Sequence, residues 1–367
     1  MTATVDHPAC GQDQHAQADD WRPTLASSPT PPTGEPRDLA AHLMEQAMGH
    51  VFSAALRTAA HHRLADHLAA GPRTPEQLAA ATGTQAPQLR RVLRYLATRG
   101  FFREDTAGAY HLTPSAVPLR TDVPDSMHPA VMMATDELFL RTSAALPEAV
   151  RHEGASFERL FGAPLFEHLT TDPATRRVFD DGMSSVSAPV DAAVADVYPF
   201  PAVGTVVDVG GGRGGLLRAA LRRHPQLTGV LFDQAPPLAH HLLEGDELKG
   251  RWRTQEGDFF ASVPEDGDVY VLKHVLHDWP DEACLRILRT CRRAMAAGRR
   301  LLVIDAVLPP GNAPHFGKTL DVAMMAVVDG RERTAEEFAT LLSAGGFRLT
   351  RILPTPAFPS IVEAVAE

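Results

Sequence analysis

The chain has 367 residues, of which 44% are hydrophobic, and a formal net charge of −10 at pH 7. That length suits two domains, each with a well-formed core. The negative charge argues against a bulk electrostatic grip on nucleic acid or on an anionic membrane. No apolar run approaches the roughly 18 residues that a membrane helix needs. No signal peptide is visible, and the three cysteines form no spaced framework, so we expect a cytoplasmic protein without nucleic-acid or membrane partners.

Four segments follow one another along the chain. Residues 1–36 include "SSPTPPTGEPR", which is rich in proline and small polar residues and predicts a disordered tail. Residues 37–122 show helical periodicity and then a hairpin pattern, and residues 123–200 are mostly helical. Residues 201–367 alternate short apolar strands with helices. This alternation indicates a doubly wound α/β domain with a parallel sheet.

The segment 37–122 has the order of a winged helix. Asp38 can cap its first helix and Gly71 can end the last helix of the first run. Thr74 and Gln77 then have capping-box spacing at the start of a short helix. A second helix and the hairpin "GFFREDTAGAYHLT" complete the motif.

A winged helix leaves open a ligand-responsive transcription factor. Its second helix, "QLRRVLRYLATR", contains several arginines and could serve as a recognition helix. The two acids of the hairpin and the negative charge of the chain argue against DNA binding. Fusion to a complete cofactor domain favours a dimerisation module instead.

A glycine loop lies in "VVDVGGGRGGLLRAAL", between a predicted strand and a helix. Gly210, Gly212 and Gly215 satisfy G-x-G-x-x-G, which alone is a weak signal for a nicotinamide cofactor or a structural turn. Asp208 precedes the loop, where a carboxylate repels a pyrophosphate but can receive an ammonium group. S-adenosylmethionine has such an ammonium and no phosphate. Asp233 ends the next strand, where an acid binds ribose hydroxyls in either cofactor type.

Two further groups of side chains are candidates for ligand contacts. In "GDFF", Asp258 could accept the adenine amino group while Phe259 covers the ring. Aromatic and methionine side chains could line an aromatic acceptor pocket, because methionine adapts to flat ligands. Ordinary core packing is the alternative for each of Phe179, Met183, Met324 and Met325.

The stretch "VLKHVLHDWPDEACLRIL" contains two histidines, His274 and His277. We expect both to lie on the strand "DVYVLKHVL" and therefore to face opposite sides, which argues against a shared metal. His277 lies near the end of that strand, where α/β sheets bind their ligands. With an ordinary pKa of about 6.5, it could take the proton of a phenol near neutral pH. A histidine that merely caps a turn is the alternative, and His274 is expected to pack under the helices or beside the cofactor.

Five motifs together resemble a known family. They are "DVGGGRGG", "LFDQ", "GDFF", "LKHVLHDWPDEACLRIL" and "DGRERTAEEFATLLSAGGF". In this order they resemble the S-adenosylmethionine-dependent small-molecule O-methyltransferases, which include plant caffeic acid and flavonoid enzymes and bacterial antibiotic-tailoring enzymes. The likeness covers residues 38–367, and "GAPLFEHLTTDPATRRVFDDGMSS" resembles the bacterial branch.

The resemblance implies a Rossmann-like class I methyltransferase domain, an N-terminal winged-helix dimerisation domain and a homodimer. It implies His277 as the general base, oriented by Asp305 and Glu332, with no metal. Together with the reading of the glycine loop, it implies cofactor contacts at Asp208, Gly210, Gly212, Asp233, Asp258, Phe259 and Lys273.

The sequence thus predicts methyl transfer from S-adenosylmethionine to a hydroxyl, phenolic by expectation, of an aromatic natural product in secondary metabolism. A nitrogen or carbon acceptor stays open, because a base would serve those too. Hydroxylation or decarboxylation assisted by the same cofactor also stays open. Some bacterial relatives perform such reactions, although they tend to lack the histidine base.

Overall fold

The structure is a computed structural model that describes residues 36–367. The predicted disordered tail therefore lies outside the described residues, except for Pro36. Residues Met44–Glu367 form one compact unit, which is described here by itself. Helix α1 (Pro36–Ala47) begins before this unit. Because α1 starts at Pro36, Asp38 lies inside its first turn, and the predicted cap concerns a side chain outside those that the structure describes.

The helical run after α1 is divided where the backbone leaves the helical region. Helix α2 (Gly49–His61) and helix α3 (Leu64–Leu68) are separated at Arg63, whose φ of 51° is left-handed. Gly71, with a φ of 140°, turns the chain shortly after α3 ends.

The predicted helix, turn, helix and hairpin are present. Helix α4 (Pro75–Thr82) begins at Thr74, and both arms of the capping box with Gln77 are formed. Helix α5 (Ala86–Thr98) follows, and strands β1 (Phe102–Glu104) and β2 (Tyr110–Leu112) pair antiparallel. The 3-10 helix η1 (Pro114–Leu119) closes the motif. The core of this winged-helix segment is built from fully buried apolar side chains, among them Leu64, Leu78, Leu93, Leu96 and Phe102.

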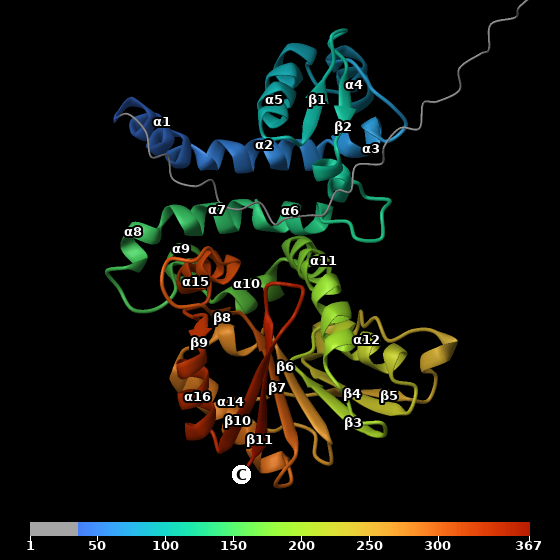
Figure 1. Ribbon diagram of the computed structural model, residues 1–367, viewed down its shortest axis with the longest axis vertical. Coiled ribbons are helices and arrows are strands. Elements are labelled where there is room, and N and C mark those ends of the chain that lie inside the picture. Colours follow the sequence, from blue (N-terminus) through green and yellow to red (C-terminus); the bar gives the residue numbers. More distant parts are fainter. Residues whose placement is uncertain (1–35) are drawn as a thin grey trace, which may run out of the picture. The chain divides into compact units, whose positions relative to one another are not determined.

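The following segment is helical, as its pattern predicts. It comprises α6 (His128–Ala134), α7 (Glu137–Ala144), α8 (Leu146–Ala149), α9 (Ser156–Phe161), α10 (Leu165–Thr171) and α11 (Pro173–Val197). The long helix α11 packs against α6 and against α12 of the sheet domain, and Figure 1 shows it between these two elements. One helix therefore contributes side chains to both regions.

A seven-stranded sheet forms the rest of the unit, in the order β10-β11-β7-β6-β3-β4-β5. Its strands are β3 (Gly204–Val209), β4 (Leu227–Asp233), β5 (Trp252–Glu256), β6 (Val269–Lys273), β7 (Arg300–Asp305), β10 (Phe347–Pro354) and β11 (Ser360–Ala366). The central strands are parallel, and β11 runs antiparallel to both of its neighbours. The sheet thus has the expected α/β class.

Helices and short elements connect these strands (Figure 1). They are α12 (Gly215–Arg223), α13 (Ala235–Leu238), η2 (Asp246–Leu248), η3 (Leu276–Asp278), α14 (Asp281–Ala294), β8 (Val307–Leu308), α15 (Phe316–Val327), β9 (Arg333–Thr334) and α16 (Ala335–Ala344). Two separate apolar clusters fill the two faces of the sheet. Cys284 and Cys291 are buried in one of them, as their spacing on a helix predicts.

The predicted strand "DVYVLKHVL" is shorter than expected. Strand β6 ends at Lys273, and His274 has a φ of 51°, a left-handed conformation that no strand continues through. The chain then turns into η3, which contains His277. The expectation that the two histidines face opposite sides of one strand is therefore wrong.

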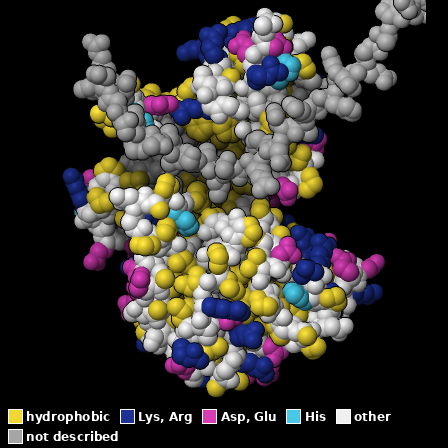
Figure 2. All heavy atoms as spheres, viewed as in Figure 1, with side chains coloured by type: hydrophobic (Ala, Val, Ile, Leu, Met, Phe, Trp, Pro, Cys, Tyr) yellow, Lys and Arg dark blue, Asp and Glu magenta, His cyan; other side chains and the backbone are white. Residues whose placement is uncertain are grey.

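The surface fits the charge balance of the sequence. On the face drawn in Figure 2, Lys and Arg side chains are interspersed with Asp and Glu, and hydrophobic side chains lie between them. No helix among residues 36–367 is both long enough and apolar enough to cross a membrane.

Replacement of Thr74, the N-cap of α4, tests the capping box in the winged-helix segment. Thr74→Ala removes the side chain that accepts from the Gln77 N–H, so we expect a loss of about 1 kcal/mol in the free energy of unfolding, measured by urea denaturation. Thr98→Ala is the control, because the Thr98 hydroxyl only donates to Tyr95 O near the end of α5. Equal losses in the two variants would contradict the capping role.

Candidate active site

The glycine loop lies between β3 and α12 and folds back on the strand ends. The φ values of Gly210 and Gly212, 66° and 60°, are left-handed, which glycine adopts without strain. The Gly210 N–H donates to Phe232 O at 2.8 Å. A Cβ on Gly215 would collide with the carboxylate of Asp191. A Cβ on Gly212 would meet nothing within 4 Å, so the loop leaves its backbone open to a ligand at that residue.

Asp208 lies beneath this loop with no donor to satisfy it. Its side chain is 1% exposed, and neither carboxylate oxygen has a hydrogen-bond partner among the described residues. Burial raises the pKa of Asp208 to about 7, although the charge of Lys273 opposes this. A buried acid without donors is costly, and an arriving ammonium group would supply the missing donors. The residues present thus fit the methionyl end of S-adenosylmethionine.

The other predicted cofactor residues lie around the same loop. Asp233 accepts from the Gly212 N–H and the Gln234 N–H, each at 2.7 Å, and each oxygen keeps a free lone pair. Asp258 accepts from the Phe260 N–H at 2.8 Å in the turn after β5.

Phe259 lies directly against the glycine loop. Its ring would be 3.4 Å from a Cβ on Gly210, and its edge packs on Trp279, with ring centroids 6.2 Å apart. The ring therefore borders the space over the loop, where the sequence predicts the adenine.

Lys273 has a buried partner that the sequence analysis missed. Its Nζ forms an ion pair with Asp191 of α11, and the two side chains are only 10% and 8% exposed. Burial raises the pKa of Asp191, and the charge of Lys273 opposes this. The available signal was an acid on the apolar face of α11, between the buried Val190 and Val194, because a buried acid needs a partner.

His277 lies in η3 and is held by acids on both ring nitrogens. Its side chain is buried, and Nδ1 is 2.8 Å from Glu332 Oε1. Because a carboxylate only accepts, Nδ1 donates this hydrogen bond. Nε2 is 3.4 Å from an oxygen of Asp278. The Glu332 N–H in turn donates to Asp321 of α15 at 2.8 Å.

The acids change the proton affinity of His277. Burial opposes the charged imidazole, but the charges of Asp278, Glu332 and Asp305 outweigh it and raise the pKa of His277 to about 10. Burial likewise raises the pKa of Asp278 to about 6 and raises the pKa of Asp305, although the charge of His277 opposes the rise at both acids. At neutral pH the imidazole therefore holds its proton, in contrast to the ordinary value assumed from the sequence.

The two acids expected beside His277 differ in their contacts. Glu332 makes the hydrogen bond to Nδ1. Asp305 is fully buried at the end of β7, and neither of its oxygens has a hydrogen-bond partner within residues 36–367. It acts on the imidazole through its charge alone. Asp278, the next residue in the chain, lies 3.4 Å from Nε2 and was not predicted as a partner of the ring.

His274 lies beside His277 and not across the sheet from it. The two rings stack with centroids 5.3 Å apart, and Phe358 stacks on His274 at 5.8 Å. Burial lowers the pKa of His274 well below its ordinary value, so this ring is neutral. Among residues 36–367, no group of three His, Cys, Asp or Glu side chains could hold a metal ion.

The candidate acceptor residues come from two helices. On α11, Phe179 stacks on Phe139 with centroids 6.5 Å apart and meets Phe166 edge-on. Met183 follows Gly182, where a Cβ would collide with Met133. On α15, Met324 and Met325 are half-buried, on the helix whose Asp321 holds Glu332.

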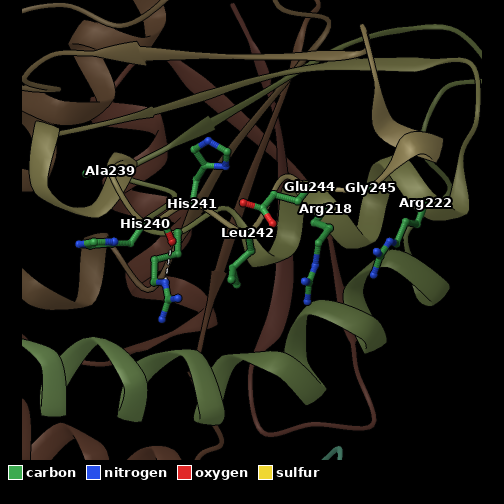
Figure 3. Close-up of a pocket in the computed structure, with 9 residues that line it drawn as sticks. Arg218, Arg222, Ala239, His240, His241, Leu242, Glu244 and Gly245 are labelled. Atoms are coloured by element: carbon green, nitrogen blue, oxygen red, sulfur yellow. Dashed lines mark hydrogen bonds between the residues drawn. The ribbon is translucent and has the colours of Figure 1, made fainter.

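A concave feature lies beside the glycine loop but outside the histidine site. It is a polar surface pocket lined by Arg213, Arg218, Arg222, Ala239, His240, His241, Leu242, Glu244 and Gly245 (Figure 3). Arg213, the one non-glycine residue inside the loop, donates its Nε to His240 O at 2.8 Å and pairs with Asp181 of α11. The pocket includes neither His277 nor Asp208, so it is not the candidate for the chemistry.

The arrangement defines a class of protein. A mostly parallel sheet with a glycine loop after β3, an acid at the end of β4 and a buried histidine beyond β6 is that of a Rossmann-like methyltransferase. The chain belongs to the O-methyltransferase family: residues 144–348 match its O-methyltransferase domain and residues 44–122 match its dimerisation domain. The family and the fold class expected from the motifs are thus confirmed.

Individual relatives agree over nearly the whole chain. The chain is 43% identical to the phenazine O-methyltransferase PhzM of Lysobacter antibioticus, over 89% of this chain and 96% of that protein. The solved structure of CalO1, a methyltransferase in calicheamicin biosynthesis, holds S-adenosylhomocysteine; it is 45% identical, with a TM-score of 0.83 over 91% of this chain and all of that one. The aclacinomycin 10-hydroxylase RdmB of Streptomyces purpurascens is 36% identical, over 88% of each chain.

Removing one partner of the buried Lys273 pair tests its geometry. Asp191→Asn leaves the buried ammonium of Lys273 without its paired carboxylate and with only Asp208, which makes no hydrogen bond to it, as an opposite charge. We therefore expect a loss of about 3–5 kcal/mol in the free energy of unfolding, measured by urea denaturation. Asp196→Asn on the same helix is the control, because its pair with Arg223 is exposed and such pairs contribute little. A similar small loss in both variants would contradict the buried pair.

Proposed function

We propose that this chain transfers a methyl group from S-adenosylmethionine to a phenolic hydroxyl of an aromatic natural product, with His277 as general base. The observation that carries the proposal is the buried His277–Glu332 pair beyond the carboxyl end of β6, beside the glycine loop and its unpartnered Asp208. Family membership and relatives named for phenazine, puromycin and mitomycin substrates support the reaction type and the aromatic acceptor.

The cofactor residues divide the ligand among them. Asp208 receives the ammonium of the methionyl group, Asp233 the ribose hydroxyls and Asp258 the adenine amino group, while Phe259 covers the ring. Gly210 and Gly212 let the backbone come close to the cofactor. Lys273, which is paired with Asp191, bounds the cofactor site on its buried side. When bound, S-adenosylmethionine would supply a methyl group on a sulfonium: a phenolate oxygen would take it by in-line displacement, the S–CH3 bond would break, and S-adenosylhomocysteine would leave as the neutral thioether.

His277 takes the phenolic proton on Nε2 while Nδ1 stays hydrogen-bonded to Glu332. A phenol has a pKa of about 10, close to the raised pKa of His277, so the proton transfer between them is nearly balanced. Asp278 and Asp305 stabilise the charged imidazole that results. Phe179, Met183, Met324 and Met325 line the acceptor site, where flat side chains and flexible thioethers suit an aromatic ring.

The winged-helix domain makes the protein a homodimer. Support comes from the match of residues 44–122 to the family's dimerisation domain. Within that match, Met44, Met48 and Val51 are 60%, 46% and 38% exposed, and an apolar surface of this kind suits a subunit interface.

Transfer of a labelled methyl group from S-adenosylmethionine to a panel of phenols tests the reaction. We expect label in a phenolic product with the wild-type chain. His277→Ala should lower kcat by about 10²–10⁴ and leave cofactor binding, measured by calorimetry, unchanged. His241→Ala is the control, a histidine outside the site. Lost cofactor binding in His277→Ala would count against the role of His277 as the general base.

Oxidation or decarboxylation is the outcome to separate from methyl transfer, since RdmB is named a hydroxylase. Cofactor left uncleaved while oxygen is consumed would replace the proposal with hydroxylation, and cofactor left uncleaved while carbon dioxide is released would replace it with decarboxylation.

The dependence of activity on pH tests the raised pKa. Only the neutral imidazole accepts a proton, and with a pKa of about 10 this form is the minority at pH 7. For a phenol of ordinary pKa, kcat/KM should therefore rise about tenfold per pH unit from pH 7 towards 10. Asp278→Asn removes the largest charge that raises the pKa, so its profile should level off at lower pH. Glu282→Gln, exposed on α14, should behave as wild type; a wild-type profile that is flat above pH 7 would contradict the account.

A further inference from the structure

Arg333 is a buried cation that the proposed chemistry does not use. It is 1% exposed, and it is among the largest fully buried side chains in the described part of the chain. Its guanidinium donates to Asp281 through Nε at 3.0 Å and Nη2 at 2.7 Å. A buried charge needs such a partner, but its remaining contacts point to a second role.

The same guanidinium holds both ends of the turn that contains His277. Nη1 donates to Leu276 O and Nη2 to Trp279 O, each at 3.0 Å. These carbonyls flank the pair His277–Asp278. Arginine has a planar fork of donors that can bind two acceptors at once, so one side chain fixes the turn on both sides of the imidazole.

The backbone of Arg333 is fixed independently of its side chain. It pairs with Val307 of β8, the strand that follows the Asp305 end of β7. The residue before it, Glu332, holds Nδ1 of His277 and is itself tied to Asp321. Close packing adds to this, because a Cβ on Gly330 would collide with the carbonyl of His277.

We propose that Arg333 is a positioning residue for His277: its side chain fixes the turn that contains the imidazole, while its backbone holds Glu332 at hydrogen-bond distance from Nδ1. The inference rests on the proposed function, since it makes Arg333 act through the base. A continuous set of contacts thereby links helix α15 to the turn that contains His277. Asp321 of α15 accepts from the Glu332 N–H, and the next residue, Arg333, donates to Leu276 O in the turn.

Arg333→Lys keeps the charge but loses the fork, because an ammonium cannot reach Leu276 O, Trp279 O and Asp281 with the same geometry. We expect kcat to fall at least tenfold, with KM and calorimetric affinity for S-adenosylmethionine within about twofold of wild type. The pH at which kcat/KM levels off should decrease, because the Glu332 contact that raises the pKa of His277 loosens. Arg331→Lys is the matched control: it lies two positions away in the same loop, and its partners Glu337 and Asp281 are at the surface.

Two measurements keep the test decisive if Arg333→Lys folds poorly or no acceptor is found. Asp281→Asn removes the carboxylate that the Arg333 guanidinium binds, on a side chain that is 55% exposed. The pH at which kcat/KM levels off should then decrease by less than in Arg333→Lys. Titration of the His277 imidazole by NMR needs no turnover, and its pKa should fall in both variants and stay unchanged in Arg331→Lys. An unchanged imidazole pKa and an unchanged kcat in Arg333→Lys would overturn the positioning role. If the imidazole pKa shifts but even the wild type transfers no methyl group, the proposed function fails and the contact between Arg333 and the turn stands.

Discussion

The hydrogen bond from His277 Nδ1 to Glu332 joins two parts of the chain that the fold brings together only at the end of the sheet. His277 follows β6, whereas Glu332 follows α15 and precedes β9. This one bond sets the direction in which Nε2 points and fixes the proton on Nδ1. Asp321 behind Glu332 and the close approach of Gly330 to the turn are organised around the same contact.

Burial gives the site its electrostatic character. Asp278, Asp305 and Glu332 surround one imidazole in a region from which water is excluded, and acids placed so closely compete for protons. Their charges stabilise the imidazolium, the form that the base adopts once it has taken a proton. A second buried set, Asp191, Lys273 and Asp208, lies under the glycine loop with one acid in excess of the lysine. Both sets therefore stabilise a positive charge, the imidazolium of His277 in one place and an arriving ammonium group in the other.

Much of this could be predicted from the sequence because the signals are local. The glycine loop, the capping box at Thr74 and the alternation of strands and helices each depend on residues within a few positions of one another. His274 could not be predicted to turn, because its left-handed conformation follows from the ending of β6 and not from its residue type. Strand β5 could not be predicted for another reason: it is an edge strand with mostly exposed residues, "WRTQE", and lacks an apolar run.

Contacts between distant segments were the harder part. Asp191 and Lys273 are far apart in the chain, and only the packing of α11 on the sheet domain pairs them. Asp305 was expected to bind the imidazole, but the backbone at the end of β7 leaves its carboxylate without a hydrogen bond. The raised pKa of His277 likewise depends on three acids from three separate elements.

A neutron crystal structure at pH 7 would locate the protons of the His277 ring and so show whether the imidazole is charged. We expect deuterium on both Nδ1 and Nε2, with Glu332 unprotonated beside Nδ1. A bare Nε2 at that pH would mean that the acids do not hold the imidazole in its charged form, and it would contradict the electrostatic basis proposed here for the base.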